Sequence, residues 1–220
     1  MKKVFLFLLA FSTIIHCYSQ TSMKYILKGK AKYKRQDYKG AIADFNKAIE
    51  IDPYDAISYY NIGNAKYNLG DYRGAIENFN KAIEIYPKDP DAFDNRGLSK
   101  FELKDYGGGA IQDFTKAIEI DSDNVVSYYI RGNAKNGILD YQGAIADYSK
   151  AIEIDSLFGD AYKSRGLTKY SLDDYKGAIA DYSKAIELNP ENSVTYYIRG
   201  IVKYKLQGYL EALADFNIGN

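Results

Sequence analysis

The chain has 220 residues, with 29 Lys and Arg against 29 Asp and Glu, which is a length for one or two domains and a charge without net bias. The balanced charge excludes the strongly basic surface that is typical of nucleic-acid binding, and a single Cys excludes internal disulfides and Cys-rich zinc sites. With 46% apolar and 26% charged residues, the composition is that of a folded protein. The unusual feature is the aromatic content, with 23 Tyr and 10 Phe but no Trp.

Residues 1–19 have the pattern of a secretory signal peptide. Lys2 and Lys3 precede an apolar run that is shorter than the roughly 20 residues of a membrane-spanning helix. Cys17 and Ser19 are small residues at the third and first positions before a cut that follows Ser19. We therefore expect an exported protein, periplasmic or extracellular and bacterial, with no transmembrane span in the mature chain. Two alternatives stay open: a lipoprotein anchored at Cys17, and a retained N-terminal anchor.

The mature chain that this cut would leave has no His and no Cys, because the only ones are His16 and Cys17. Nucleophilic triads need a base that is usually His, and most structural zinc sites need His or Cys. The acids are spread along the chain near lysines, as in Lys47 and Glu50, which is typical of solvated helix faces. The sequence therefore predicts no catalytic residue, no metal site and no cofactor, and we do not expect an enzyme.

One sequence unit repeats along the chain with a nearly constant period. The string Gly-Ala-Ile, which marks it, begins at Gly40, Gly74, Gly109, Gly143 and Gly177. The spacing is the same at every step but one, where the run 107–109 contains one extra Gly. Counted from these strings, the units cover residues 22–55, 56–89, 90–124, 125–158, 159–192 and, incompletely, 193–220. A fixed period of about 34 residues is the signature of a repeat architecture.

Each unit contains two stretches with apolar residues at helical spacing. The first stretch has an aromatic residue followed four positions later by a Gly, as at Tyr25 and Gly29. The second has Ala41, Phe45 and Ala48, or their equivalents, on one helix face. We expect Gly29 to face Ala41 and Ala48, so that the two helix backbones approach closely. Each unit is therefore predicted to be a helix-turn-helix hairpin.

These units resemble the tetratricopeptide repeat over residues 22–220. The residues that carry the resemblance in one unit are Gly63, Tyr67, Ala75, Phe79, Ala82 and Pro87. The resemblance implies an all-α fold, a right-handed superhelical solenoid of about six helix-turn-helix repeats whose first helices line a concave surface. It also implies a scaffold that binds a peptide or a partner protein.

Two positions depart from that family's pattern. Arg replaces the expected Leu just before the Gly in four units, and Lys stands three residues after the Gly in every unit. These residues are Arg96, Arg131, Arg165 and Arg199, and Lys32, Lys66, Lys100, Lys135, Lys169 and Lys203. Like charges four residues apart on one face repel each other unless they are countered. We predict that acids of the second helix bridge them, namely Asp44, Asp113, Asp147, Asp181 and Asp215; the alternative is separate solvated faces.

The concave surface that the resemblance implies is the candidate binding site. Its candidate groove residues are Tyr60, Asn61, Asn64, Tyr67, Asp94, Asn95, Tyr129, Asn133, Lys163, Tyr170 and Tyr197. A Tyr offers a large rigid contact with a polar tip, and an Asn both donates to and accepts from a peptide backbone. The alternative for Tyr67 and Tyr170 is packing between neighbouring helices.

The expected partner is a protein or peptide, and not a nucleic acid. Two other functions stay open: a cell-envelope assembly factor that associates end to end through uncapped first and last units, and a glycan-binding module. The extra Gly and the pair Asn136-Gly137, which weakens a helix interior, make residues 105–140 the segment that we expect to be least rigid.

Overall fold

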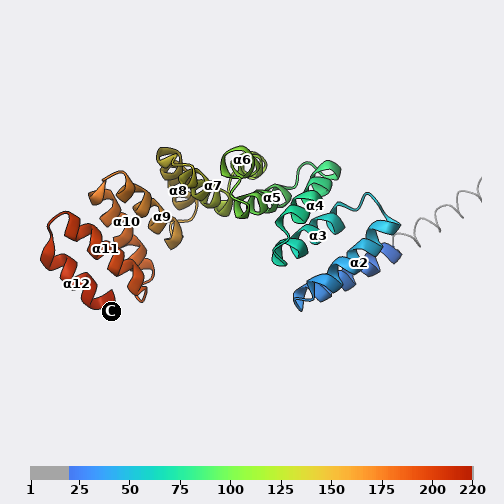
Figure 1. Ribbon diagram of the computed structural model, residues 1–220, viewed down its shortest axis with the longest axis horizontal. Helices are drawn as coiled ribbons and strands as arrows, with labels where there is room; N and C mark the ends of the chain where they lie inside the picture. Colours follow the sequence, from blue (N-terminus) through green and yellow to red (C-terminus); the bar gives the residue numbers. More distant parts are fainter. Residues whose placement is uncertain (1–19, 220) are drawn as a thin grey trace, which may run out of the picture. The chain divides into compact units, whose positions relative to one another are not determined.

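The computed structural model describes residues 20–219, which form helices joined by short turns, with no strand in that range. The predicted signal peptide, residues 1–19, lies outside the described residues. The chain divides into two compact units, one up to Lys104 and one from Asp105 onward. The all-α fold of helix-turn-helix repeats that the sequence predicts is confirmed within both (Figure 1).

The first compact unit consists of helices that each pack against the next one along the chain. Its helices are 20–34, α2 (Tyr38–Ile51), α3 (Ala56–Asn68), α4 (Tyr72–Ile85) and α5 (Pro90–Glu102).

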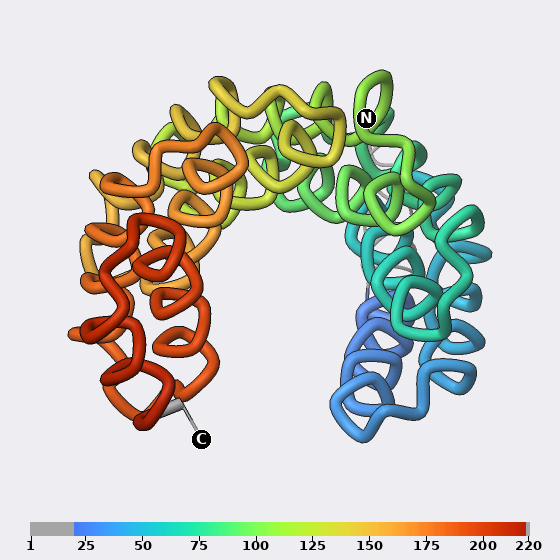
Figure 2. Tube along the Cα trace, turned by 60° about the vertical axis from the view of Figure 1, so that its left-hand side comes forward, coloured from blue at the N-terminus to red at the C-terminus, as the bar shows by residue number. Residues whose placement is uncertain are grey.

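The second compact unit continues the same pattern, and the tube in Figure 2 shows its hairpins stacked one on the next. It begins with a short π-helix and contains η1 (Tyr106–Ala110), α6 (Ile111–Ile120), α7 (Val125–Gly137), α8 (Tyr141–Ile154), α9 (Gly159–Ser171), α10 (Tyr175–Leu188), α11 (Ser193–Lys205) and α12 (Tyr209–Gly219).

In five hairpins, a ring of the second helix lies against a glycine of the first helix. Ala41, Phe45 and Ala48 are fully buried, as their spacing predicts. The expected partner of Gly29 was wrong, however, because a Cβ on this glycine would lie 2.6 Å from the ring of Phe45. The glycine therefore makes room for an aromatic ring, which is larger than the two alanines that we expected it to face. The same separation of 2.6 Å recurs at Gly63, Gly132 and Gly200.

An aspartate caps the second helix of four hairpins. Asp37 Oδ1 accepts a hydrogen bond from the backbone N–H of Gly40 at 2.9 Å, and Asp140 Oδ1 accepts one from Gly143 at 3.0 Å. Capping of this kind satisfies a helix N–H that has no partner within the helix. A Cβ on either glycine would overlap the capping carboxylate. This explains why a Gly opens the Gly-Ala-Ile string.

The extra Gly of the longer repeat is absorbed as one π-helical turn. In η1 the N–H of Ala110 donates to the carbonyl of Asp105, five residues earlier, at 3.0 Å. In the regular hairpin, the N–H of Ala144 donates to the carbonyl of Asp140, four residues earlier, at 2.9 Å. A π turn of this kind is the usual consequence of a single inserted residue in a helix. The one-residue insertion predicted from the sequence is confirmed.

The two irregular segments of residues 105–140 meet in one contact. A Cβ on Gly137 of α7 would lie 3.2 Å from the ring of Tyr106 in η1. The Gly at 137 therefore leaves room for the ring of Tyr106. The low rigidity of residues 105–140 stays a prediction.

A buried carboxylate joins the two helices of a hairpin. Asp147, which is only 4% exposed, accepts hydrogen bonds from Arg131 Nε at 2.9 Å and Nη2 at 2.6 Å. Lys135 Nζ lies 2.8 Å from the same carboxylate. Arg131 also donates from Nη1 to Thr115 Oγ1 at 3.1 Å, which ties α7 to the preceding hairpin. We call this arrangement of one Asp with one Arg and one Lys the ion clamp.

The ion clamp recurs in the following hairpins. It consists of Asp181 with Arg165 and Lys169, and of Asp215 with Arg199 and Lys203. In the first compact unit, Asp44 pairs with Lys32 at 2.6 Å. The predicted bridges are therefore confirmed at four acids, namely Asp44, Asp147, Asp181 and Asp215. The burial of these acids contradicts the alternative of separate solvated faces. Asp113 is equally buried, and its bridge stays a prediction.

Candidate functional site

The residues predicted to line a groove all lie on first helices of the hairpins. In the first compact unit they belong to α3 and α5, and in the second to α7, α9 and α11. Most are half-buried, whereas Tyr197 on α11 is 51% exposed. The first helices therefore present a partly accessible face in each unit, separate from the second-helix face that carries the capped Gly-Ala-Ile strings.

In the first compact unit, several of these side chains bond to one another. Asn95 Nδ2 donates to Tyr60 Oη at 2.9 Å and to Asn64 Oδ1 at 3.1 Å. Burial raises the pKa of Tyr60, so that its hydroxyl is protonated at neutral pH. Asn61 Nδ2 donates to the carbonyl of Ile57 in its own helix at 2.7 Å. Much of the amide hydrogen-bonding capacity that a peptide would use is therefore engaged within the surface itself.

Tyr67 and Tyr170 pack between helices, as the alternative for these residues proposed. The ring of Tyr67 lies 5.3 Å from that of Tyr72, and the ring of Tyr170 lies 5.6 Å from that of Tyr175. The Tyr67 hydroxyl also donates to Glu102 Oε1 at 3.3 Å. Burial, helped by the nearby Glu102 carboxylate, raises the pKa of Tyr67 to about 12. These rings connect the two helices of a hairpin and retain partly exposed edges.

The second compact unit contains a closed aromatic cluster around Tyr148 of α8. The ring of Tyr129 lies 6.0 Å from the ring of Tyr148 and 4.9 Å from that of Phe158. The Tyr148 hydroxyl donates to Asn133 Oδ1 at 2.8 Å. Two predicted groove residues, Tyr129 and Asn133, thus complete the surroundings of a buried tyrosine.

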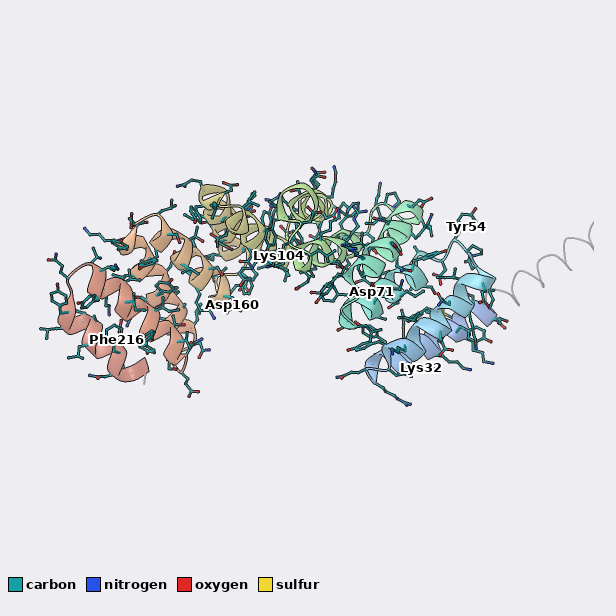
Figure 3. The ribbon with its side chains drawn as sticks, in the orientation of Figure 1. Lys32, Tyr54, Asp71, Lys104, Asp160 and Phe216 are labelled. Carbon is teal, nitrogen blue, oxygen red and sulfur yellow. The ribbon has the colours of Figure 1, made fainter. Side chains whose placement is uncertain are left out.

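One repeat further along, a pocket of about 420 Å³ opens between α9 and α11. Its size falls in the range of ligand sites, roughly 300–1,000 Å³. The lining residues are Tyr129, Asp160, Lys163, Ser164, Leu167, Tyr182, Asn192, Val194, Thr195 and Ile198. A second hollow of about 200 Å³ shares Asp160, Lys163, Asn192 and Thr195 with it. Asp160 is labelled at the start of α9 in Figure 3.

Tyr182, which lines this pocket, carries a hydroxyl that has no partner among the described residues. Tyr182 is 1% exposed, and its Oη has no hydrogen-bond partner among the residues that the structure describes. Burial raises the pKa of Tyr182 to about 12, so the hydroxyl is a proton donor at neutral pH. A buried donor left unpaired costs free energy. The Tyr182 hydroxyl is therefore a candidate donor for an acceptor that reaches it from the pocket.

The rim of the pocket carries opposite charges that neutralise each other. Lys163 Nζ lies 2.6 Å from Asp160 Oδ1. Asn192 Oδ1 accepts from the N–H of Thr195 at 3.2 Å, which caps α11. Two of the predicted groove residues, Tyr129 and Lys163, line this pocket.

Sequence reasoning missed Tyr182, Leu167 and Ile198, which contribute to the apolar lining of the pocket. The one available signal was a mismatch between equivalent positions. Tyr182 and Tyr148 stand where other units have Phe, yet the residue facing Tyr148 is Asn133 whereas its equivalent in the next repeat is Leu167. The remaining predicted residues are dispersed: Asp94 is half-buried on α5, and Tyr197 packs on Phe216 with ring centroids 5.5 Å apart.

Neither a metal centre nor a membrane span is found among the residues that the structure describes. Over this range, no three His, Cys, Asp or Glu side chains are grouped so that they could hold a metal ion. None of the helices in residues 20–219 has the length and apolar character needed to cross a bilayer.

Two family models match parts of the sequence. The model for the TPR repeat matches residues 29–70, and the model for the tetratricopeptide repeat matches residues 56–89 and 159–192. No curated protein matches the chain.

Solved structures with the same fold include MamA, YrrB and pilF of Pseudomonas aeruginosa. MamA is 25% identical, with a TM-score of 0.71 over 74% of this chain and 94% of MamA. YrrB, described as a TPR protein with an unusual peptide-binding site, is 22% identical, with a TM-score of 0.72 over 86% of this chain and 97% of YrrB. The pilF protein is 16% identical, with a TM-score of 0.76 over 90% of each chain. These likenesses establish the helical repeat fold.

Proposed function

This chain is a tetratricopeptide repeat protein, and from that premise we propose that it is a protein-interaction scaffold. In this proposal, the first helices of the hairpins hold an extended segment of a partner protein. The observation that carries the proposal is the pocket between α9 and α11, whose buried Tyr182 hydroxyl has no partner among the described residues. The description of YrrB as a protein with a peptide-binding site supports it.

The chemistry of the surface fits a peptide better than a charged ligand. Its rings, such as the partly exposed Tyr129 and the half-exposed Tyr197, offer rigid contact area with polar tips. The charges at the pocket, Asp160 and Lys163, already form an ion pair. A scaffold with this surface gains affinity from buried side chains of the peptide and orients it through a few hydrogen bonds.

Selection of peptides from a displayed random library on the purified chain 20–220 tests the proposal. Recovered peptides are expected to bind the wild type in solution, measured by fluorescence anisotropy, and to lose at least tenfold in affinity in Val194→Arg. Val194 lines the pocket and is largely exposed, so the larger side chain blocks access without altering the core. Leu139→Arg, in an exposed turn between α7 and α8, is the matched control. Peptides that bind both variants as well as the wild type would place the site elsewhere.

We further propose that the protein is exported by means of residues 1–19, on the strength of the basic start and the short apolar run. Expression of the full chain in a bacterial host, followed by mass measurement of the recovered protein, tests this. A mature protein that begins at Gln20 is the expected result. Acylation at Cys17 would favour the lipoprotein alternative instead, and a full-length product retained in the membrane would favour the N-terminal anchor.

Self-association is a second candidate, favoured by the apolar residues that α12 exposes. Leu210, Leu213 and Ile218 are each more than half exposed, whereas Ile179, at the position of α10 that corresponds to Leu213, packs on the buried cluster around Tyr182 and Val202. Light scattering across a concentration series is expected to show dimers or larger species if these residues bind a second copy. A monomer at every concentration, or an oligomer that persists in Leu210→Glu, would remove this candidate.

A further inference from the structure

The surroundings of Tyr148 in hairpin α7–α8 can be compared with those of Tyr182 in hairpin α9–α10. Tyr148 and Tyr182 occupy the same position in successive repeats. Around Tyr148, the equivalent space contains the ring of Tyr129, which packs on Tyr148 and on Phe158. The hydroxyl of Tyr148 is satisfied by the amide oxygen of Asn133. A ring and an acceptor oxygen therefore complete this site.

At Tyr182 each of those groups is replaced. The position of Tyr129 is taken by Lys163, whose amine is held at the rim by Asp160. The position of Phe158 is taken by Asn192, whose side chain caps α11. The position of Asn133 is taken by Leu167, which has no acceptor atom in its side chain. All three of the replacing residues line the pocket.

The Tyr182 ring is also held less tightly than its counterparts. A Cβ on Gly166 would lie 3.2 Å from this ring, compared with 2.6 Å between a Cβ on Gly132 and the ring of Tyr148. The ring of Tyr182 thus sits further from its own glycine. The contact between this ring and its own glycine is therefore looser than the one at Tyr148.

Resting on the proposed function, we propose that this pocket takes an uncharged aromatic side chain of the partner segment, Phe or Tyr, whose backbone carbonyl accepts a hydrogen bond from the Tyr182 hydroxyl. The incoming ring replaces Tyr129 of the preceding hairpin, and the carbonyl replaces the amide oxygen of Asn133. Tilted ring pairs contribute beyond their buried area, and pairing the buried hydroxyl removes the cost of an unsatisfied donor.

The charges around the pocket favour a neutral occupant. Asp160 and Lys163 compensate each other at the rim. The lining also includes the apolar side chains of Leu167 and Ile198, and Ile198 packs on the buried cluster that contains Tyr182. A charged side chain would lose its hydration there without gaining a partner. An aliphatic side chain would fill the pocket without the ring contact to Tyr182.

A titration with N-acetyl-phenylalanine N-methylamide tests the proposal, because this probe carries one ring and two amide carbonyls. The readout is the NMR shift of ring-labelled tyrosines, with the Tyr182 signal assigned by its loss in Tyr182→Phe. We expect a saturable shift of the Tyr182 signal. The leucine analogue is expected to bind roughly threefold to tenfold more weakly, the factor that an aromatic pair contributes, and the glutamate analogue more weakly still.

Two variants borrowed from the preceding hairpin sharpen the test. Lys163→Tyr combined with Asn192→Phe restores the two rings and is expected to abolish the Tyr182 shift. Leu167→Asn supplies an internal acceptor and is expected to weaken the probe by roughly fivefold, the value of one hydrogen bond. This single change serves on its own if the double variant does not fold. Equal binding of the phenylalanine and leucine probes, or binding that both variants leave unchanged, would overturn the proposal.

The titration separates this inference from the proposed function. If displayed peptides bind but show no aromatic preference and the phenylalanine probe leaves Tyr182 unchanged, the inference fails while the scaffold function stands. If no displayed peptide binds but the probe shifts Tyr182 as expected, the proposed scaffold function fails and the pocket is still an aromatic site.

Discussion

Hairpins α7–α8 and α9–α10 have nearly the same second helix and different surroundings for the same ring. The sequences of α8 and α10, YQGAIADYSKAIEI and YKGAIADYSKAIEL, differ at two positions. Both carry an N-cap aspartate and an ion clamp. Only Tyr148 has a hydrogen-bond partner among the described residues, however, whereas Tyr182 lies under an open pocket.

The difference between the two sites therefore originates in their first helices. Asn133 of α7 provides the acceptor that Leu167 of α9 lacks, and Tyr129 provides the ring that Lys163 lacks. This division shows how a repeat can keep its fold while it varies its surface. The second helix supplies the packing and the clamp, and a few first-helix positions decide whether the space above the ring is closed or open.

The largest expected effect concerns what the two hairpins share. In Asp147→Asn, the isosteric amide leaves Arg131 and Lys135 largely buried without a countercharge, which we expect to cost about 3 kcal/mol of unfolding free energy. Asp181→Asn is expected to cost about the same in the neighbouring hairpin. Urea denaturation of both variants measures this. A loss below about 0.5 kcal/mol in either would show that its clamp behaves as a solvated surface pair.

The pH dependence of stability tests the ion clamp of the next hairpin, α11–α12, through the carboxylate of Asp215. Burial alone would raise the pKa of Asp215, but hydrogen bonds from Arg199 and Lys203 hold that pKa below its ordinary value. A carboxylate with a depressed pKa in the folded state stabilises above its unfolded pKa of about 3.9, and this stabilisation is lost as the pH falls through the folded value.

Thermal melts between pH 6 and pH 2 test this expectation. The wild type should lose stability below about pH 4, and Asp215→Asn should begin from a lower melting temperature and show a flatter acid limb. The variant Asp160→Asn, at an exposed ion pair, serves as the control and should retain the slope of the wild type. Parallel curves for Asp215→Asn and the wild type would contradict the contribution of this clamp.

The repeat and the ion clamp could be predicted from the sequence because both depend on side chains that are present at a fixed spacing. Asp147 and Arg131 recur with the period of the repeat. They lie on the two helices of one hairpin, so that their pairing depends on the fold of that hairpin alone. The groove residues were predicted by position alone, so that the internal bonds of Asn95 and Asn133 were not foreseen.

The pocket could not be predicted in the same way, because it is a space that the surrounding side chains leave unfilled. Tyr182 lies on the buried face of a second helix, and its place in the pattern indicates core packing. Its hydroxyl becomes a functional candidate only when the residues facing it, Leu167 and Lys163, are compared with those facing Tyr148. Which side chains face each other across two helices follows from the packed structure and not from the spacing along one helix.

The two glycines beneath these rings offer the next test of the comparison. Gly132→Ala places a Cβ 2.6 Å from the Tyr148 ring. Because the closed site gives this ring no space to move away, we expect a loss of about 1–3 kcal/mol in unfolding free energy. In Gly166→Ala the separation is 3.2 Å, and the Tyr182 ring can move toward the pocket. The gain of about 1 kcal/mol in helix propensity should then offset most of the strain. Equal losses in both variants, measured by urea denaturation, would show that the pocket gives the ring no freedom.

The smallest expected effect concerns the two hydroxyls themselves. Tyr148→Phe removes a satisfied hydrogen bond and strands the amide oxygen of Asn133, so we expect a loss of about 1 kcal/mol. Tyr182→Phe removes a buried donor that has no partner among the described residues, so its unfolding free energy should stay unchanged or rise. Phe occupies the same position at Phe45 and Phe79, where it is fully buried, so neither substitution is foreign to the repeat. If Tyr182→Phe loses as much unfolding free energy as Tyr148→Phe, the Tyr182 hydroxyl has a hydrogen-bond partner in solution. The hydroxyl would then not need a ligand in the pocket as its acceptor.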